Sequence, residues 1–182
     1  CSLDETASFY GLNKVAPLSS AIKSLIDPTK FNIIFHPKSN AHGREWSLDN
    51  YSHVIKMLDP KMFKIFISGT EKEKIILKDW IATLPETVVD LTGKFSLAEF
   101  LSFINSANGL VASSTGPLHL AAALGKHAIG LYPPMRPMHT GRWGALGKHA
   151  HNLSITKNCS DCRGHAEKCV CVNLIKATEV VQ

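Results

Sequence analysis

The chain has 182 residues, of which 45% are hydrophobic and 19% are charged, and its formal net charge is +5. This length gives room for one domain with a proper core, and the composition is that of an ordinary globular chain. No apolar run approaches the roughly 18 residues of a membrane span, and the lysines are scattered rather than clustered, which argues against nucleic-acid binding. A mildly basic surface suits anionic ligands or an anionic membrane face.

The first thirty residues are weakly patterned, although Ala7–Leu12 and Ala21–Ile26 favour short helices. We expect residues 1–30 to form a leader or interdomain segment and residues 31–182 to form the folded domain. Because the chain begins at Cys1 rather than at a methionine, we also expect it to be a fragment or a processed product.

A buried strand is predicted over Phe31–Phe35, followed by a polar loop, 36–46. Loops that follow the carboxyl ends of parallel strands carry the ligand contacts in open α/β sheets. Basic side chains of this loop are therefore candidates to meet an anion: Lys38, His42 and Arg44. The competing interpretation is a solvated loop in which Trp46 packs back on the core.

Two strand–helix units follow. Ser47 is typical of an N-cap, and the helix after it has a periodic inner face: Leu48, Tyr51, Val54, Ile55 and Leu58. Met62–Ile67 predicts a second strand, and 71–84 a helix with these candidate buried positions: Ile75, Leu77, Trp80, Ile81 and Leu84. Glu71 and Glu73 fall in the first turn of that helix, where they either complement its dipole or accept hydrogen bonds from ligand hydroxyls.

A short third strand is predicted over Val88–Leu91, and Ser96 with Glu99 forms the pattern of a capping box. The helix that they start is expected to bury four side chains: Leu97, Phe100, Leu101 and Ile104.

Residues 110–124 read as a strand, a tight turn and an alanine-rich helix. Pro117 suits a first helical position, and a Ser or Thr just before it can cap the helix. Such a turn points free backbone N–H groups and the positive end of a helix dipole at a ligand, and phosphates bind there most readily. His119, two residues into the helix, adds a hydrogen-bond donor near the same turn. The alternative to a phosphate site is an ordinary strand-to-helix connection.

A fifth strand is predicted over His127–Leu131, and a last strand over His151–Thr156. The long loop between them holds a second anion-capable group, unless it is simply a surface loop: Arg136, His139, Thr140, Gly141 and Arg142. Leu174–Val181 is expected to close the chain as a helix.

Strands alternating with helices predict an α/β fold, a Rossmann-like parallel sheet with helices on both faces and ligands at its carboxyl edge.

Four cysteines lie close together before the final helix: Cys159, Cys162, Cys169 and Cys171. Four thiolates can hold a structural Zn²⁺, although the two pairs are closer than in most zinc modules, and His165 could replace one ligand. Disulfides or reduced buried thiols are the alternatives. A catalytic metal is not expected here, because the group follows the last predicted strand.

The segment from Ser113 to Ala123 resembles the signature of the lipopolysaccharide heptosyltransferases, glycosyltransferase family 9. The resemblance continues through four further stretches in order: His36 to Ser47, Ser68 to Glu73, Leu91 to Leu97 and Leu131 to Pro134. It implies a GT-B architecture of two Rossmann-like domains, of which this chain would be the C-terminal, nucleotide-sugar-binding one.

The resemblance also implies roles for single residues. Arg44 falls where the family has a lysine that contacts the donor phosphates, and Glu73, rather than Glu71, falls at the acidic position that binds the ribose. The diphosphate- and sugar-binding turn matches Thr115, Gly116 and His119, and the segment from Thr92 through Lys94 to Leu97 falls where the base is held. The donor-binding candidates are therefore Lys38, Arg44, Glu73, Thr92, Lys94, Ser114, Thr115, Gly116 and His119.

Two departures from the family pattern concern the donor sugar. The family has Asp before Thr-Gly, and this chain has Ser114; a carboxylate lost there weakens the case for heptose but leaves the phosphate-binding logic untouched. The stretch Tyr132-Pro-Pro-Met135 likewise departs from the more usual Gly-Pro-Thr-Asp-Pro.

The resemblance implies an inverting glycosyltransferase of lipopolysaccharide core biosynthesis that transfers a hexosyl or heptosyl group, with an ADP-heptose-like donor, a lipopolysaccharide-core acceptor and no required cofactor or catalytic metal. It would be cytoplasmic, with peripheral contact to the inner membrane face. The general base would belong to the N-terminal domain, so we expect this chain alone to bind donor without transferring sugar. The alternatives are a non-catalytic nucleotide-sugar-binding module, a zinc-stabilised interaction domain and, less favoured, an epimerase on the same fold.

Overall fold

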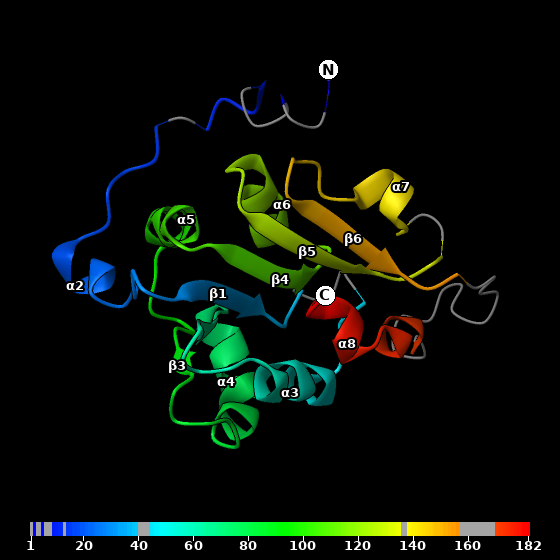
Figure 1. Ribbon diagram of the computed structural model, residues 1–182, viewed down its shortest axis with the longest axis horizontal. Coiled ribbons are helices and arrows are strands. Elements are labelled where there is room, and N and C mark those ends of the chain that lie inside the picture. Colours follow the sequence, from blue (N-terminus) through cyan, green and yellow to red (C-terminus); the bar gives the residue numbers. More distant parts are fainter. Residues whose placement is uncertain are drawn as a thin grey trace.

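The computed structural model describes residues 2, 5, 9–12, 14–39, 44–135, 138–156 and 170–182. Its centre is a six-stranded sheet in the order β3-β2-β1-β4-β5-β6, in which every neighbouring pair is parallel (Figure 1). The strands are β1 (Phe31–His36), β2 (Phe63–Ile67), β3 (Val89–Asp90), β4 (Gly109–Ser113), β5 (His127–Tyr132) and β6 (Ala150–Ser154). The predicted α/β fold is therefore confirmed.

Helices cover both faces of the sheet, α5 and α6 on one side and α3, α4 and α8 on the other (Figure 1). The helical elements are α2 (Ser20–Lys23), α3 (Leu48–Met57), α4 (Glu71–Ile81), α5 (Leu97–Ser106), α6 (Gly116–Ala123), α7 (Thr140–Trp143), the 3-10 turn η3 (Cys171–Leu174) and α8 (Ala177–Val180). Alternate strand residues enter opposite cores: Ile33 and Phe35 pack under α3, whereas Ile34 packs under α5 and α6. None of the described helices is long and apolar enough to cross a membrane.

Three details of the predicted elements are wrong. Ile75 is 78% exposed, because Glu73 and Leu77, four residues apart, form the inward face of α4. Leu97 is 76% exposed, since it is the first residue of α5 and lies at the open edge of the sheet. The predicted C-terminal helix is instead the turn η3 followed by the single-turn helix α8.

Residues before β1 are attached to the domain. Leu18, Ile22, Leu25 and Ile26 pack against the core beneath α5 and α6. The buried amide of Asn32 accepts a hydrogen bond from the backbone N–H of Asp27 and donates to the carbonyl oxygens of Asp27 and Lys30. This network fixes the turn that leads into β1.

The C-terminal segment docks on α3 and on the residues before it. The indole Nε1 of Trp46 donates to the carbonyl oxygen of Ile175 at 3.0 Å. Asn173 accepts a hydrogen bond from the backbone N–H of Ser47 at 2.8 Å, and its carbonyl accepts one from Asn50. Residues far apart in the sequence thus close the same face of the core.

Tyr51 provides a stability prediction. Its ring packs edge-on against Phe35 and Trp46, but its buried hydroxyl has no hydrogen-bond partner among the described residues. A buried hydroxyl without a partner costs about 1–3 kcal/mol, so Tyr51→Phe should raise the free energy of unfolding by about 1 kcal/mol, measured by urea denaturation. Tyr132→Phe is the matched control and should destabilise, because the Tyr132 hydroxyl donates to Trp143 O and accepts from Ala145 N. A loss of stability in the Tyr51 variant would contradict the prediction.

Candidate functional site

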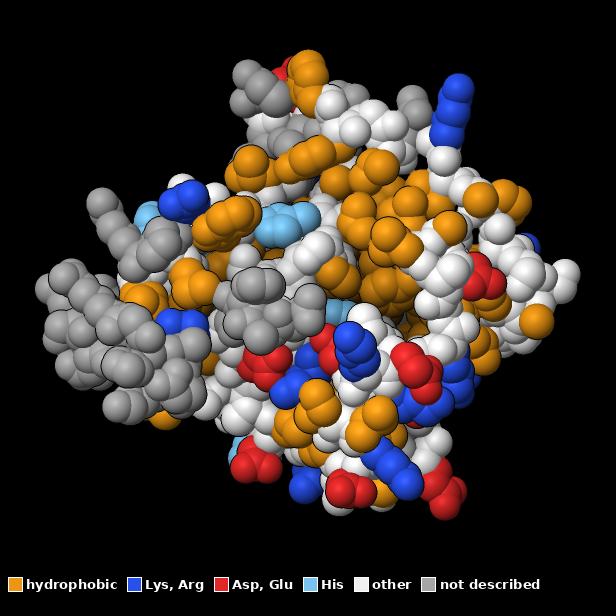
Figure 2. Space-filling model, turned by 180° about the vertical axis from the view of Figure 1, so that it is seen from behind, with side chains coloured by type: hydrophobic (Ala, Val, Ile, Leu, Met, Phe, Trp, Pro, Cys, Tyr) orange, Lys and Arg blue, Asp and Glu red, His pale blue; other side chains and the backbone are white. Residues whose placement is uncertain are grey.

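A cleft with a volume of about 770 Å³ opens at the carboxyl edge of the sheet. The loops after β1, β2, β3 and β4 and the N-termini of α4, α5 and α6 form its walls. The space-filling view shows a hollowed area with hydrophobic side chains in its wall and charged side chains below it (Figure 2). Carboxyl-edge clefts of parallel sheets are the usual ligand sites of this architecture.

Three helix N-termini reach the cleft, and their capping differs. Thr70 and Glu73 form a capping box at α4, and Ser96 and Glu99 form one at α5, so each helix has its own carboxylate over its free N–H groups. The helix α6 has no acidic residue in its first turn and no side-chain cap. The positive end of α6 is therefore open to an external anion.

Two hydroxyls near the end of β4 have no hydrogen-bond partner among the described residues, and only that of Thr115 lines the cleft at this open terminus. Ser113 ends β4 and is 1% exposed, and its Oγ has no hydrogen-bond partner among the described residues. Thr115 occupies the N-cap position of α6, but its Oγ1 is also buried without a partner there. The expectation that a Ser or Thr side chain caps α6 is therefore wrong. Buried hydroxyls without partners are costly, which points to a ligand that supplies the missing bonds.

Two further candidate residues, Ser114 and His119, lie near the N-terminus of α6. The Ser114 side chain hydrogen-bonds to the hydroxyl of Tyr132, whose pKa is raised by burial to about 12. Both Ser114 and Thr115 line the cleft, whereas His119 lies one turn into α6, half-buried and outside the lining. Burial lowers the pKa of His119, which favours its neutral form.

Two acidic residues line the opposite side of the cleft. Glu73 is 7% exposed, and its Oε2 accepts a hydrogen bond from the backbone N–H of Thr70 at 2.7 Å. Glu71 is exposed and lies against Gly93, where a Cβ atom would sit within 1.9 Å of its Oε2. Gly93 has a φ of +68° and donates its backbone N–H to Gly69 O, so two glycines bring the loops after β2 and β3 together.

Two of the basic residues after β1 contact other side chains of the protein. The ammonium of Lys38, which lines the cleft, forms an ion pair with Glu45, and the same carboxylate accepts the backbone N–H of Ser39. Arg44 lies outside the cleft lining; its Nη2 is 3.8 Å from the sulfur of Met135, and its buried Nε has no partner among the described residues. His42 lies outside the described residues.

The remaining candidates lie away from the cleft. Thr92 is fully buried and donates from Oγ1 to Asp90 at 2.6 Å, and Lys94 is exposed but does not line the cleft. His139 caps α7, and Arg142 lies over the ring of Trp143, so neither contributes to this site. Arg136 lies outside the described residues.

The cysteine group is described only at Cys171. This thiol is buried beside Met135 and Met138. Cys159, Cys162 and Cys169 lie outside the described residues, together with His165. In the parts of the chain that the structure describes, no group of three His, Cys, Asp or Glu side chains is placed to hold a metal ion.

Sequence reasoning missed several lining residues. His36 and Ser68 come from the ends of two adjacent strands, and Phe95 and Phe100 supply an apolar wall. The strand-end positions of His36 and Ser68 were readable in the sequence, but nothing local indicated that the two side chains meet. Leu97, which is exposed, also belongs to this apolar wall.

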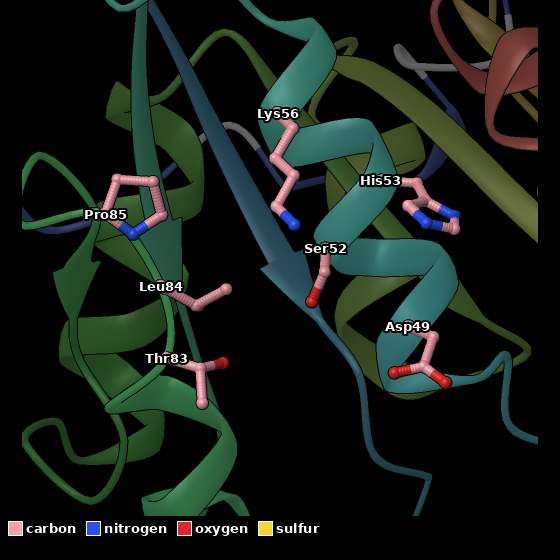
Figure 3. Close-up of a pocket in the computed structure, with 7 residues that line it drawn as sticks. All are labelled: Asp49, Ser52, His53, Lys56, Thr83, Leu84 and Pro85. Atoms are coloured by element: carbon pink, nitrogen blue, oxygen red, sulfur yellow. The ribbon is translucent and has the colours of Figure 1, made fainter.

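A second pocket, of about 350 Å³, lies between α3 and the segment after α4 (Figure 3). Its polar groups do not converge: the close-up shows His53 and Lys56 leaving α3 on different sides. Ser52 is already bonded, since its Oγ accepts from Trp80 Nε1 and donates to Leu48 O. The Ser52 hydroxyl is therefore not free to bind a ligand in this pocket.

Comparison with known proteins gives consistent matches. The sequence profile of glycosyltransferase family 9 (heptosyltransferase) matches residues 9–172. The lipopolysaccharide core heptosyltransferase OpsX of Haemophilus influenzae is 25% identical over 123 residues, which are 66% of this chain and 35% of that protein. Lipooligosaccharide heptosyltransferase 2 of the same organism is 28% identical over 102 residues, 54% of this chain and 30% of that protein.

Solved structures of similar fold cover most of this chain. The Escherichia coli ADP-heptose lps heptosyltransferase II has a TM-score of 0.71 at 19% identity, over 92% of this chain and 51% of that one. A glycosyl transferase family 9 structure from Veillonella parvula has a TM-score of 0.73 at 18% identity, over 93% and 52%. The chain thus spans about half the length of these structures and about a third of the curated relatives.

Proposed function

Because the chain belongs to glycosyltransferase family 9 (heptosyltransferase), we propose that it is the donor-binding part of a GT-B glycosyltransferase and binds a nucleoside diphosphate sugar in the carboxyl-edge cleft. The observation that carries the proposal is the contrast among the three helix N-termini. Two are closed by their own glutamates, and α6 is open beside the unpaired hydroxyl of Thr115, which lines the cleft. An anion therefore has one favoured place in the cleft.

The positions of the ribose and the base are inferred from the position of the diphosphate. With the diphosphate at the Thr115-Gly116 turn, Glu73 accepts hydrogen bonds from the ribose hydroxyls on the β2 side of the cleft. The base then lies along the apolar wall formed by Phe95, Leu97 and Phe100. This order of acidic, apolar and hydroxyl-rich walls suits a nucleotide better than a simple phosphate or a neutral sugar.

The proposed chemistry is glycosyl transfer with inversion. An acceptor hydroxyl attacks the anomeric carbon, the bond to the diphosphate oxygen breaks, and the nucleoside diphosphate leaves with the added charge. Backbone N–H groups at the start of α6 stabilise that charge, assisted by Arg44 and His119 after small movements. The proton of the acceptor goes to a general base outside this chain, so the chain alone binds donor without transferring sugar, and no metal or cofactor is part of the scheme.

The donor base and the acceptor class are drawn from relatives. A solved structure of a related enzyme is titled E. coli heptosyltransferase WaaC with ADP, and an adenine nucleotide is accordingly the proposed donor base. We propose a lipopolysaccharide core as the acceptor and the cytoplasmic side of the inner membrane as the place of the reaction. Ser114, where the family has a carboxylate, favours a donor sugar other than heptose or a non-catalytic nucleotide-sugar module.

Calorimetric titration with ADP, UDP and GDP, each with and without its sugar, tests the proposal. We expect ADP to bind selectively and Glu73→Gln to weaken it by about tenfold, because a carboxylate accepts two ribose hydroxyls more strongly than an amide does. Glutamine keeps the capping box of α4 intact. Glu99→Gln, in the equivalent box of α5 but outside the cleft lining, is the control and should leave affinity unchanged. Absence of any nucleotide binding by the wild-type chain would overturn the proposal.

A further inference from the structure

His36 occupies the centre of the carboxyl edge. It is the last residue of β1, which lies between β2 and β4, and it pairs in register with Ala112 of β4. From β1 the chain proceeds to β2 and β3 on one side of the sheet, and β4 to β6 continue on the other. His36 therefore lies at the switch point of the sheet, between the acidic wall at Glu73 and the open N-terminus of α6.

The imidazole of His36 is held on two sides. Its Nδ1 is 2.9 Å from Ser68 Oγ, and Ser68 is itself fixed, because its backbone N–H donates to Phe35 O at 2.9 Å. The ring packs against Phe100 with a centroid separation of 6.0 Å and an angle of 31°. These contacts hold the imidazole ring in one orientation in the cleft wall.

The ring is neutral at neutral pH. His36 is 8% exposed, and burial lowers its pKa, against a smaller opposing effect of the carboxylates of Glu73 and Glu45. A neutral imidazole carries one ring proton, and the partner of the other nitrogen decides where that proton sits.

The Ser68 hydroxyl decides which ring nitrogen of His36 carries the proton. It lies 3.4 Å from Phe35 O and 2.9 Å from His36 Nδ1. When the hydroxyl donates to Phe35 O, it accepts from Nδ1–H; when it donates to Nδ1, the ring proton is on Nε2. Nε2 has no hydrogen-bond partner among the described residues, and His36 lines the cleft.

We propose that His36 is a further donor-binding residue: in the complex the Ser68 hydroxyl donates to Nδ1, and Nε2–H donates a hydrogen bond to a phosphate oxygen of the bound nucleoside diphosphate. The phosphate nearest the ribose is the partner, because His36 lies between the ribose wall at Glu73 and the α6 terminus that receives the diphosphate. This assignment rests on the proposed function, and Ser68 acts through His36 as a positioning residue.

Two substitutions at His36 separate a ligand contact from a structural role. Asparagine retains a group at the place of Nδ1 and keeps the Ser68 contact, whereas glutamine places an N–H near the position of Nε2. With the nucleoside diphosphate that the wild-type chain binds best, H36N should lose roughly 10- to 100-fold in affinity, as expected for a hydrogen bond to a charged group, and H36Q should stay within about threefold of wild type. Thermal unfolding of both variants reports the structural cost separately.

The nucleoside of the same base, titrated by NMR, is the second probe. Neither variant should change nucleoside affinity, because the nucleoside has no phosphate. Equal losses in H36N and H36Q, or an equal loss for the nucleoside, would overturn the role of His36 while leaving the proposed function in place. A wild-type chain that binds no nucleoside diphosphate would overturn both.

The tautomer of His36 is testable without substitution. Nitrogen-15 spectra of the imidazole in the complex with the nucleoside diphosphate should show a protonated Nε2 and an unprotonated Nδ1. The signal of Nε2 should move on addition of the nucleoside diphosphate and not on addition of the nucleoside. A proton on Nδ1 in that complex would contradict the assignment.

Discussion

Replacing Gly116 by aspartate is expected to reduce nucleoside diphosphate affinity at least 100-fold while making the unbound chain slightly more stable. Gly116 is the first residue of α6, and a Cβ atom there meets nothing within 4 Å, so the side chain fits. A carboxylate in the first turn complements the helix dipole by about 0.3–1 kcal/mol. The same carboxylate repels a diphosphate about 4 Å away by about 4 kcal/mol per pair of charges at an effective dielectric constant of 20.

This prediction is specific because the substitution should lower the affinity for the nucleoside diphosphate and raise the stability of the unbound chain. Gly116→Asn has nearly the shape of the aspartate variant without the charge, and it should lose less than about tenfold in affinity, since only steric and backbone effects remain. Calorimetry measures the affinity, and thermal unfolding of the unbound chain measures the stability. Unchanged affinity in the aspartate variant would place the diphosphate elsewhere in the cleft.

Replacing Gly130 by alanine is expected to cost about 3 kcal/mol of folding free energy, which corresponds to a fall in Tm of about 6–12 °C for a chain of this size. Gly130 lies in β5, and a Cβ atom there would come within 2.4 Å of Tyr132 Cε2 and 2.9 Å of Leu118 Cδ2. The Tyr132 ring and Leu118 are both fully buried, so neither can move away freely.

The control for this prediction is Gly116→Ala, where the added methyl group meets nothing within 4 Å. Its Tm should remain within about 2 °C of wild type, because alanine fits the first turn of a helix. Denaturant unfolding would separate the two variants. A Gly130→Ala chain as stable as wild type would show that β5 and α6 can shift apart without loss of packing.

Local patterns in the sequence were sufficient for most of the fold. The capping residues Ser47 and Ser96 start helices as predicted, because an N-cap depends on neighbours within three residues. The apolar runs of β1 and β4 are buried on both faces, which is why they read as strands without alternation. The error at Ile75 has a local cause: Ile75, Ile76 and Leu77 are consecutive apolar residues, and their order alone does not show which of them faces the sheet.

The site depended on contacts that the sequence does not encode locally. Ser114 and Thr115 line the cleft because they follow the end of β4, and Glu73 lines it from the first turn of α4. Arg44 and Thr92 turn instead toward neighbours, the sulfur of Met135 and the carboxylate of Asp90. Such partners decide whether a side chain points into the cleft or packs against the rest of the protein. They are brought together only when the sheet forms.

The docking of the C-terminal segment has a consequence for how the chain is made. Trp46 is 1% exposed, and its indole N–H is satisfied by Ile175, 129 residues later in the sequence. Val172, Ile175 and Val180 cover the same core as β1 and α3. During translation the first strand and its helix therefore leave the ribosome with this face uncovered, and it is completed only once residue 175 and its neighbours have emerged. A segment that is synthesised well after β1 thus completes the core to which β1 contributes.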